Sequence, residues 1–217
     1  MSEYPVPILD NAIPINAYVP IDLSVSNPEI KERNIADPAD CQAYIDTVLM
    51  AEKGRVAYGG YLEKRNLYVN KHNFSDKTSP RNIHLGMDFW CEAGTKVITP
   101  MDGVVHSYKN NTTLGDYGPT IVLEHRLESY TFHTLYGHLS VESLDELYIG
   151  KKFKAGSTLA RLGAPSINVN YASHLHFQII RDMESNFGDY PGVCSNETFD
   201  FYLKNCPDPD ILLKIPG

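Results

Sequence analysis

The sequence lacks a long apolar run and a dense basic cluster. No stretch approaches the roughly 18 apolar residues that a membrane-spanning helix requires, so we expect no membrane insertion. The formal net charge is -8, and the densest basic run is Lys151, Lys152 and Lys154. Binding to nucleic acid requires clustered Lys and Arg that neutralise phosphates. We therefore expect neither a nucleic-acid partner nor an anionic membrane partner.

Cysteine is also scarce, and no two cysteines are closely spaced. They stand at positions 41, 91, 194 and 206 without a C-x-x-C pair, so a zinc finger is unsupported. The first residues carry no Lys or Arg, and prolines and acids interrupt every apolar stretch, unlike a signal peptide. These features predict a cytoplasmic protein with reduced, buried thiols. A bond between Cys194 and Cys206 is the alternative for an oxidising compartment.

The chain is long enough to bury a sizeable core without covalent staples. It has 217 residues, of which 42% are hydrophobic and 21% are charged. We expect three regions. Residues 1–80 form an N-terminal arm and a helix that pack on the core, residues 81–181 form the core itself, and residues 182–217 form a C-terminal tail with a short helix.

A helix is predicted over residues 38–53. Asp37 can cap its first turn, and Gly54 can end it. Its apolar residues recur at the spacing of one helical face. They are Cys41, Tyr44, Ile45, Val48 and Leu49. The next stretch, residues 59–69, is aromatic and basic. It could border a cleft, although packing and turn formation are the preferred interpretation.

Short alternating apolar runs separated by Gly, Asp and Asn fill residues 81–181, which is typical of β-strands and turns. The runs cover residues 96–108, 120–125, 131–139, 157–163 and 174–180. The predicted fold class is therefore mainly β with minor α. We expect an antiparallel sheet with a groove, or a barrel-sandwich-like core, carrying an N-terminal helix and extended arms.

Two short motifs carry the most specific chemistry. They are HLGMD at residues 84–88 and HLHF at residues 174–177. If the second motif is a strand, His174 and His176 project from one face while Leu175 packs into the core from the other. Imidazole is a good zinc ligand, so this face can contribute to a metal site.

The first motif offers further ligands. If it is extended, His84, Gly86 and Asp88 share one face, and Gly86 has no side chain to obstruct a metal. Two imidazoles and a carboxylate leave a position for water, as in a catalytic rather than a structural zinc site. The spare histidines, His174 and His138, can transfer protons. No H-E-x-x-H motif is present, which excludes a helical zincin with a Glu base.

The ordered motifs resemble the M23 family of zinc metallopeptidases, the lysostaphin/LytM-type endopeptidases. The matching pieces are HLGMD (84–88), GDYG (115–118), TLYGHLS (134–140), GKKFKAG (150–156) and HLHFQ (174–178). The resemblance implies one zinc ion (Zn2+) held by His84, Asp88 and His176. It also implies catalytic roles for His138 and His174, and a small antiparallel groove with the metal at its floor. The other histidines, at 72, 106, 125 and 133, are expected to be surface or core residues.

Two features depart from the family pattern. Ala172 and Ser173 precede H-L-H-F, and Gln178 follows it where Glu is usual, which should affect groove shape rather than metal binding. The usual family substrate, cross-linked peptidoglycan, lies outside the cytoplasm. A chain without a signal peptide resembles a signal-less subgroup, whose substrate would be a muropeptide or another small peptide.

The sequence therefore predicts a zinc-dependent metallo-endopeptidase acting on peptidoglycan-derived or other small peptides. The alternative is a non-catalytic zinc- or peptide-binding module on the same fold. A biotinyl or lipoyl carrier domain is disfavoured, because the comparable turn, Met101-Asp102-Gly103, offers no Lys. The assignment of base and oxyanion-stabilising histidine stays open at this point. So do the oligomeric state and whether the arm or the tail covers the groove.

Overall fold

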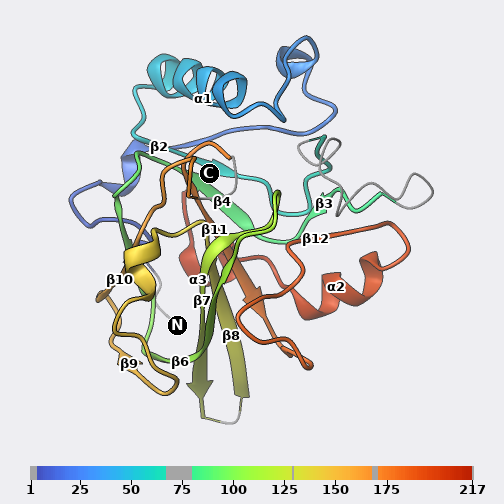
Figure 1. Ribbon diagram of the computed structural model, residues 1–217. Helices are drawn as coiled ribbons and strands as arrows, with labels where there is room; N and C mark the ends of the chain where they lie inside the picture. Colours follow the sequence, from blue (N-terminus) through green and yellow to red (C-terminus); the bar gives the residue numbers. More distant parts are fainter. Residues whose placement is uncertain (1–3, 67–79, 129, 168–170, 217) are drawn as a thin grey trace.

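A large β-sheet forms the centre of the molecule (Figure 1). The computed structural model describes residues 4–66, 80–128, 130–167 and 171–216. Eight strands are hydrogen-bonded in the order β1-β2-β4-β11-β8-β7-β6-β9. All neighbours in this sheet are antiparallel except β1 and β2, which are parallel. The predicted mainly-β class with an antiparallel sheet is confirmed.

The strands of the large sheet are β1 (Tyr18–Pro20), β2 (Val56–Gly59), β4 (Met87–Trp90), β6 (Gly103–Asn111), β7 (Gly118–Leu127), β8 (Tyr130–Gly137), β9 (Lys152–Phe153) and β11 (His174–Ile180). Two strand pairs flank it, namely β5 (Lys96–Ile98) with β10 (Thr158–Arg161), and β3 (Ile83–His84) with β12 (Val193–Cys194). The α-helices are α1 (Pro38–Glu52), α2 (Phe199–Asn205) and α3 (Asp210–Leu213). The 3-10 helices within the described residues are η1 (Ile15–Ala17), η2 (Pro28–Ile30) and η4 (Val141–Leu144).

Helix α1 begins as the sequence predicts, because the Asp37 carboxylate accepts hydrogen bonds from two backbone N–H groups of the first turn. Its buried residues are Cys41, Tyr44 and Ile45. The predicted stop at Gly54 is wrong by one residue. Lys53 takes the left-handed conformation at φ 55, and its N–H donates to the Leu49 carbonyl. Gly54 is instead a packing residue, since a Cβ there would lie 2.7 Å from a Val19 methyl group.

Two strands come from the region expected to be only an arm and a helix. Strands β1 and β2 extend the sheet beyond β4, with Gly59 opposite Asp88. They are three and four residues long, too short for a clear alternating pattern. The division at residues 80 and 181 stays a prediction, but strands from both sides of residue 80 share one sheet.

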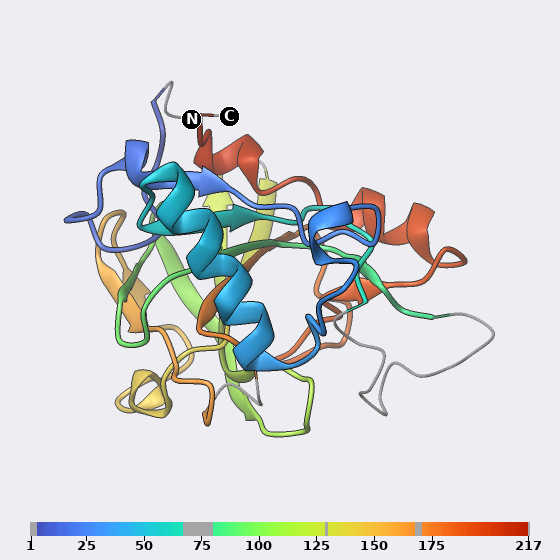
Figure 2. The ribbon, with the colours of Figure 1, turned by 90° about the horizontal axis from the view of Figure 1, so that it is seen from above.

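The two faces of β4 and β11 differ in polarity. Met87, Phe89 and Leu175 belong to the main hydrophobic core on one face. Asp88 and His176 alternate with these residues and point to the opposite face. Helix α1 runs across the middle of the view in Figure 2, whereas α2 lies at its right side, and apolar clusters join each of them to the sheet.

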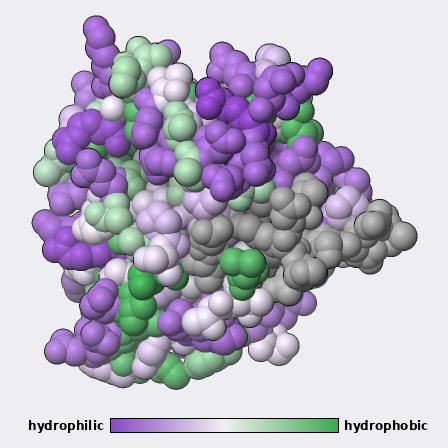
Figure 3. Space-filling model, turned by 45° about the horizontal axis from the view of Figure 1, so that its top comes forward, coloured by the Kyte–Doolittle hydropathy of each residue, from purple (hydrophilic) through white to green (hydrophobic). Residues whose placement is uncertain are grey.

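The described ends of the chain lie side by side. The Val6 N–H donates to the Leu213 carbonyl at 2.8 Å, and the Tyr58 hydroxyl donates to the Pro216 carbonyl at 3.1 Å. The face that carries α1 is mostly hydrophilic (Figure 3). Among the described residues, no helix has the length and apolar character needed to cross a membrane.

The four cysteines all fall within the described residues and form no disulfide. Three of them are buried, as the sequence predicts: Cys41, Cys194 and Cys206. Burial raises the pKa of Cys194 to about 11 and that of Cys206 to about 12. Both groups are therefore neutral thiols near pH 7, whereas Cys91 is half-buried.

Candidate metal centre and active site

Four neighbouring strands place one row of residues across the sheet. Asp88 on β4 lies opposite His176 on β11. Gly59 of β2 is the other neighbour of Asp88, and Gly137 of β8 is the other neighbour of His176. The pair of Asp88 and His176 is therefore flanked by one glycine on each side. These glycines leave space for the polar atoms of the pair on this face of the sheet.

His84 reaches this row from β3. The HLGMD motif is not one continuous strand, because the chain leaves β3 after His84 and enters β4 at Met87. Strand β3 pairs with β12, whereas β4 pairs with β2 and β11. The turn passes close to an imidazole: a Cβ on Gly86 would lie 2.6 Å from His176 Cε1. Gly86 is thus required because the His176 ring lies close to its Cα, rather than because a side chain there would obstruct the metal.

Three polar atoms face one another at this point. His84 Nε2 lies 2.9 Å from His176 Nδ1 and 3.3 Å from Asp88 Oδ1, and the last two atoms are 3.1 Å apart. All three residues are buried, with 2–3% exposure. Among the described residues this is the single group of three or more His, Cys, Asp or Glu side chains close enough to share a metal ion. The donor set of two nitrogens and an oxygen suits zinc.

The two imidazoles of this group are oriented by oxygen atoms on their outer side. His84 Nδ1 lies 2.9 Å from the Gly60 carbonyl oxygen, and His176 Nε2 lies 2.9 Å from Gln178 Oε1. These oxygens only accept hydrogen bonds, so the outer nitrogen of each ring carries the proton. The inner atoms, His84 Nε2 and His176 Nδ1, are then left as lone-pair donors for a cation.

Asp88 is held on its outer side by an arginine that no sequence motif marks. Arg65 Nη1 donates to Asp88 Oδ2 at 2.5 Å, and Arg65 Nε donates to Glu63 Oε2. Burial opposes ionisation of Asp88, but its interactions with His84, Arg65 and His176 outweigh this cost and hold its pKa well below the usual range.

The basic character of the stretch at residues 59–69 was the available signal for this arginine, but the preferred interpretation was packing and turn formation. The described part of this stretch ends at residue 66, and residues 67–69 lie outside the description. Arg65 and Gly60 within it both contact the candidate metal ligands. Arg65 lines the cavity, as the cleft-border alternative implies, whereas Gly60 lies in a turn in which its carbonyl accepts a hydrogen bond from the Glu63 N–H at 3.0 Å.

His138 and His174 stand side by side, with ring centroids 4.1 Å apart and an interplanar angle of 37°. His174 Nδ1 donates to the Ala172 carbonyl at 2.7 Å, so its lone pair is on Nε2. Burial lowers the pKa of His174, which keeps the ring neutral near pH 7. His138 follows Gly137 directly and has φ 62, a conformation uncommon for a residue with a side chain.

Aromatic side chains surround this histidine pair. The ring centroid of Tyr117 is 5.7 Å from that of His138, and the Tyr171 centroid is 5.2 Å from it. Trp90 stacks on His174 at 5.7 Å and 21°. In the sequence, Tyr117 is marked only by the GDYG motif, and no local spacing marks Trp90 or Tyr171.

The five predicted site residues all line one cavity of about 260 Å³. The C-terminal tail forms part of its wall through Asn186, Asp189, Tyr190, Pro191, Gly192 and Val193. The tail therefore borders the cavity. Asp116 lines it as well, and burial together with the Asp189 charge raises the pKa of Asp116 to about 6.

The other described histidines do not line this cavity. His106 and His133 contact each other with ring centroids 4.8 Å apart. His125 is buried, and its Nε2 lies 2.7 Å from the Thr134 hydroxyl. These positions agree with the expectation of surface or core residues, and His72 lies outside the described residues.

Residues 82–187 match the sequence profile of peptidase family M23. No curated protein matches the chain. Three solved structures are similar over part of their length. The catalytic domain of the antimicrobial peptidase lysostaphin from Staphylococcus simulans has 23% identity and a TM-score of 0.39, over 56% of this chain and 80% of that chain. LytU has 24% identity and a TM-score of 0.39, over 61% and 80%. A zinc-containing peptidase from Vibrio cholerae has 26% identity and a TM-score of 0.37, over 54% and 34%.

The profile match carries the assignment, since the structural similarities are modest. It includes all five site residues that the motifs predict, and each of these residues lines the cavity. It begins two residues before His84 and ends after His176, so the complete ligand group falls inside it. Through residues 82–187, this chain belongs to peptidase family M23.

Proposed function

We propose that the protein is a zinc-dependent metallo-endopeptidase that hydrolyses peptidoglycan-derived or other small peptides. The observation that carries the proposal is the convergence of His84 Nε2, Asp88 Oδ1 and His176 Nδ1 in a cavity that His138 and His174 also line. Membership of family M23 supports peptide hydrolysis.

The chemistry of the donor set fits a zinc ion. Burial lowers the pKa of His84 to about 4, so its imidazole is in the neutral, metal-binding form near pH 7. Asp88 is ionised, and one carboxylate with two imidazoles is a set of three protein ligands typical of catalytic zinc. A zinc ion held there would lower the pKa of a bound water and polarise the scissile carbonyl.

The histidine pair supplies the proton transfers in this proposal. His174 Nε2 accepts the proton of the attacking water, because Nδ1 is committed to the Ala172 carbonyl and burial keeps the ring neutral. The stacked Trp90 ring fixes the plane of this imidazole. His138 then donates a hydrogen bond to the oxyanion or a proton to the leaving amine.

The test combines metal content with peptide hydrolysis. Wild type, His176→Ala and His174→Ala are purified without added metal, and each is assayed on muropeptides and on short glycine-rich peptides. We expect about one zinc per wild-type chain, none in His176→Ala, and bound zinc with turnover reduced about 10²–10⁴-fold in His174→Ala. His106→Ala is the control, since that residue lies outside the cavity lining.

Two outcomes would redirect the proposal. Zinc binding by the wild type without hydrolysis of any peptide would favour the non-catalytic binding module. A wild type that binds no zinc, even when zinc is offered, would refute the metal centre.

A further inference from the structure

The two oxygens of Asp88 have different partners. Oδ1 faces the imidazoles of His84 and His176, at 3.3 and 3.1 Å. Oδ2 accepts a charge-assisted hydrogen bond from Arg65 Nη1 at 2.5 Å. A carboxylate can turn about its last bond and offer either oxygen or both, so a partner that occupies Oδ2 selects Oδ1 for the metal side.

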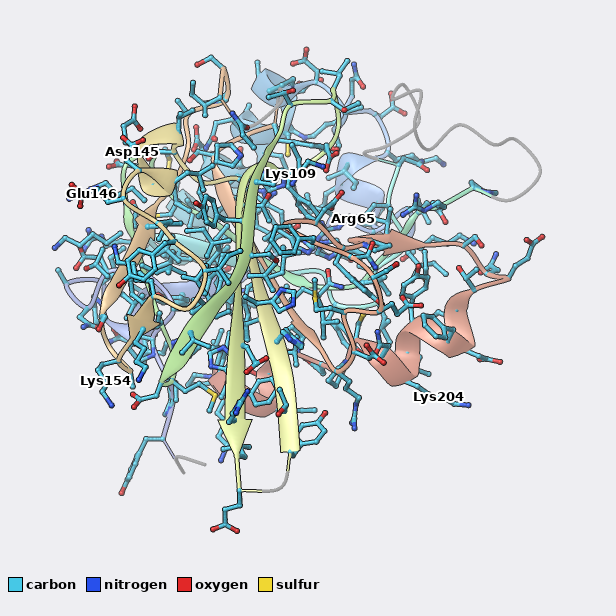
Figure 4. The ribbon with its side chains drawn as sticks, turned by 60° about the horizontal axis from the view of Figure 1, so that its bottom comes forward. Arg65, Lys109, Asp145, Glu146, Lys154 and Lys204 are labelled. Atoms are coloured by element: carbon cyan, nitrogen blue, oxygen red, sulfur yellow. The ribbon has the colours of Figure 1, made fainter. Side chains whose placement is uncertain are left out.

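Arg65 is itself immobilised from several directions. Its side chain is 1% exposed, its Nε donates to Glu63, and its guanidinium lies 5.4 Å above the Trp90 ring. Glu63 is anchored in turn, because its Oε1 accepts from the Leu23 N–H at 2.9 Å. Figure 4 shows Arg65 near the middle of the molecule, whereas Lys154 and Lys204 project at its edge.

The backbone around Arg65 is shaped to admit it. Gly60 has φ +100, and a Cβ there would lie 1.8 Å from Arg65 Nη2 and 3.2 Å from His84 Nδ1. The Gly60 carbonyl also orients His84. Backbone hydrogen bonds join this segment to the M23 core, since the His84 N–H donates to the Glu63 carbonyl at 3.0 Å. One short segment thus contacts two of the three candidate ligands.

The group of Arg65, Glu63 and Asp88 carries a net negative charge, which favours a cation at the adjacent metal site. Arg65 carries one positive charge, and Glu63 and Asp88 each carry one negative charge. Glu63 therefore offsets the arginine, and the group keeps one net negative charge beside the imidazole nitrogens. A buried arginine without Glu63 would repel a divalent cation.

We propose that Arg65 is a positioning residue of the metal centre. It lies outside the M23-matching segment and acts through its ion pair with Asp88 Oδ2. The inference rests on the proposed function, because it assumes a metal between His84, Asp88 and His176. Arg65 does not contact the metal or the substrate in this scheme. It acts by holding the Asp88 carboxylate in one orientation, as partners of metal ligands do in other sites.

The effect is measured on the full chain as zinc affinity. Wild type, Arg65→Gln, Arg65→Lys and Arg126→Gln are titrated with zinc against a chromogenic chelator, after circular dichroism confirms that each is folded. Arg126 is a matched control, because it also pairs with a Glu two residues before it, Glu124, but its side chain is 80% exposed. Loss of the partner of a metal ligand typically costs about 10–100-fold in metal affinity.

We expect Arg65→Gln to weaken zinc binding by about 10–100-fold, Arg65→Lys to fall between it and wild type, and Arg126→Gln to match wild type. The lysine variant keeps the buried charge balance, so it carries the test if Arg65→Gln does not fold. Cobalt(II) replaces zinc in a parallel series, since its visible spectrum reports the number and geometry of its ligands. A residue that only stabilised the fold would leave that spectrum unchanged.

The outcomes separate this inference from the function it rests on. A wild type that binds zinc and cleaves peptides, with Arg65 variants equal to it in zinc affinity and cobalt spectrum, would overturn the role of Arg65 alone. A wild type that binds no zinc would overturn both proposals. Weaker zinc binding with an altered cobalt spectrum in folded Arg65 variants would support the positioning role.

Discussion

Asp88 lies directly opposite His176 in the antiparallel pairing of β4 and β11, and Asp88 Oδ1 is 3.1 Å from His176 Nδ1. The two residues are 88 positions apart in the chain. Directly opposed side chains on one face of an antiparallel pair are the closest neighbours that a sheet provides. This register brings one end of the M23 segment to the other and creates the candidate metal centre.

Replacing Asp88 should abolish metal binding. We expect Asp88→Ala to retain no zinc after dialysis, because two imidazoles alone leave the site without its carboxylate. Metal analysis per chain measures this. Asp116→Ala serves as the control, since that carboxylate lines the cavity but does not belong to the three-residue group. Zinc retention by Asp88→Ala at the wild-type level would show that the metal binds elsewhere.

Replacing His174 should separate catalysis from metal binding. His174→Ala is expected to keep its zinc and to lose about 10²–10⁴-fold in kcat, the range for a positioned acid or base. Peptide hydrolysis and metal content are measured on the same sample. Loss of zinc in this variant would mean that the two histidines of HLH had been assigned in the wrong order.

Gly86 should tolerate no side chain. A Cβ at this position would lie 2.6 Å from His176 Cε1 and 2.7 Å from the Phe177 carbonyl oxygen. Gly86→Ala is therefore expected to lower the free energy of unfolding by about 1–3 kcal/mol and to weaken zinc binding, because His176 must move. Urea denaturation and zinc titration measure the two effects.

Gly150→Ala is the control for Gly86→Ala. Nothing lies within 4 Å of a Cβ at Gly150, although its φ of +88 disfavours alanine. This variant should lose some stability through its backbone and keep wild-type zinc affinity. Equal zinc affinity in Gly86→Ala and Gly150→Ala would contradict the close approach to His176.

The pH dependence of stability should report Asp116. Burial and the Asp189 charge raise its pKa from 3.8 to about 6 in the folded chain. Between pH 3.8 and about pH 6, the folded state therefore binds more protons than the unfolded chain. This contribution to stability is complete below pH 3.8 and is lost as pH rises through about 6.

Asp116→Asn should remove this pH dependence. We expect the variant to be more stable than wild type at pH 7 by about 1 kcal/mol, a value reduced for the solvent exposure of the carboxyl group. Urea denaturation of both proteins from pH 4 to pH 8 measures the difference. Asp145→Asn removes the same charge from an exposed position and controls for the change in net charge. A variant less stable than wild type at pH 7 would contradict the raised pKa.

The candidate site was predictable where short motifs carry it. His84, Asp88 and His176 have ligand chemistry at short spacings, and His138 and His174 share those motifs. Arg65, Trp90 and Tyr171 carry no comparable local pattern. They meet the site through strand pairing and loop packing over long separations, which periodicity in a short window does not contain.

The fold shows the same division. Alternating runs longer than a few residues predicted β6, β7, β8 and β11, and a capping residue with a helical apolar face predicted α1. The sequence pattern did not predict the short strands β1 and β2, or the break between β3 and β4 at Leu85 and Gly86. Such features depend on which neighbour a backbone segment pairs with, rather than on the segment alone.

The sequence by itself determined the family, the mainly-β class and the identity of the five site side chains, because residue chemistry and strand alternation are local properties. Only the tertiary structure decided which atoms of those side chains meet. It also decided that Gly60, Arg65 and Gln178 contact the outer polar atoms of the three candidate metal ligands. The physical reason is that hydrogen-bond directions and sheet register set distances of about 3 Å between residues far apart in the chain, and these arise only when the whole core packs.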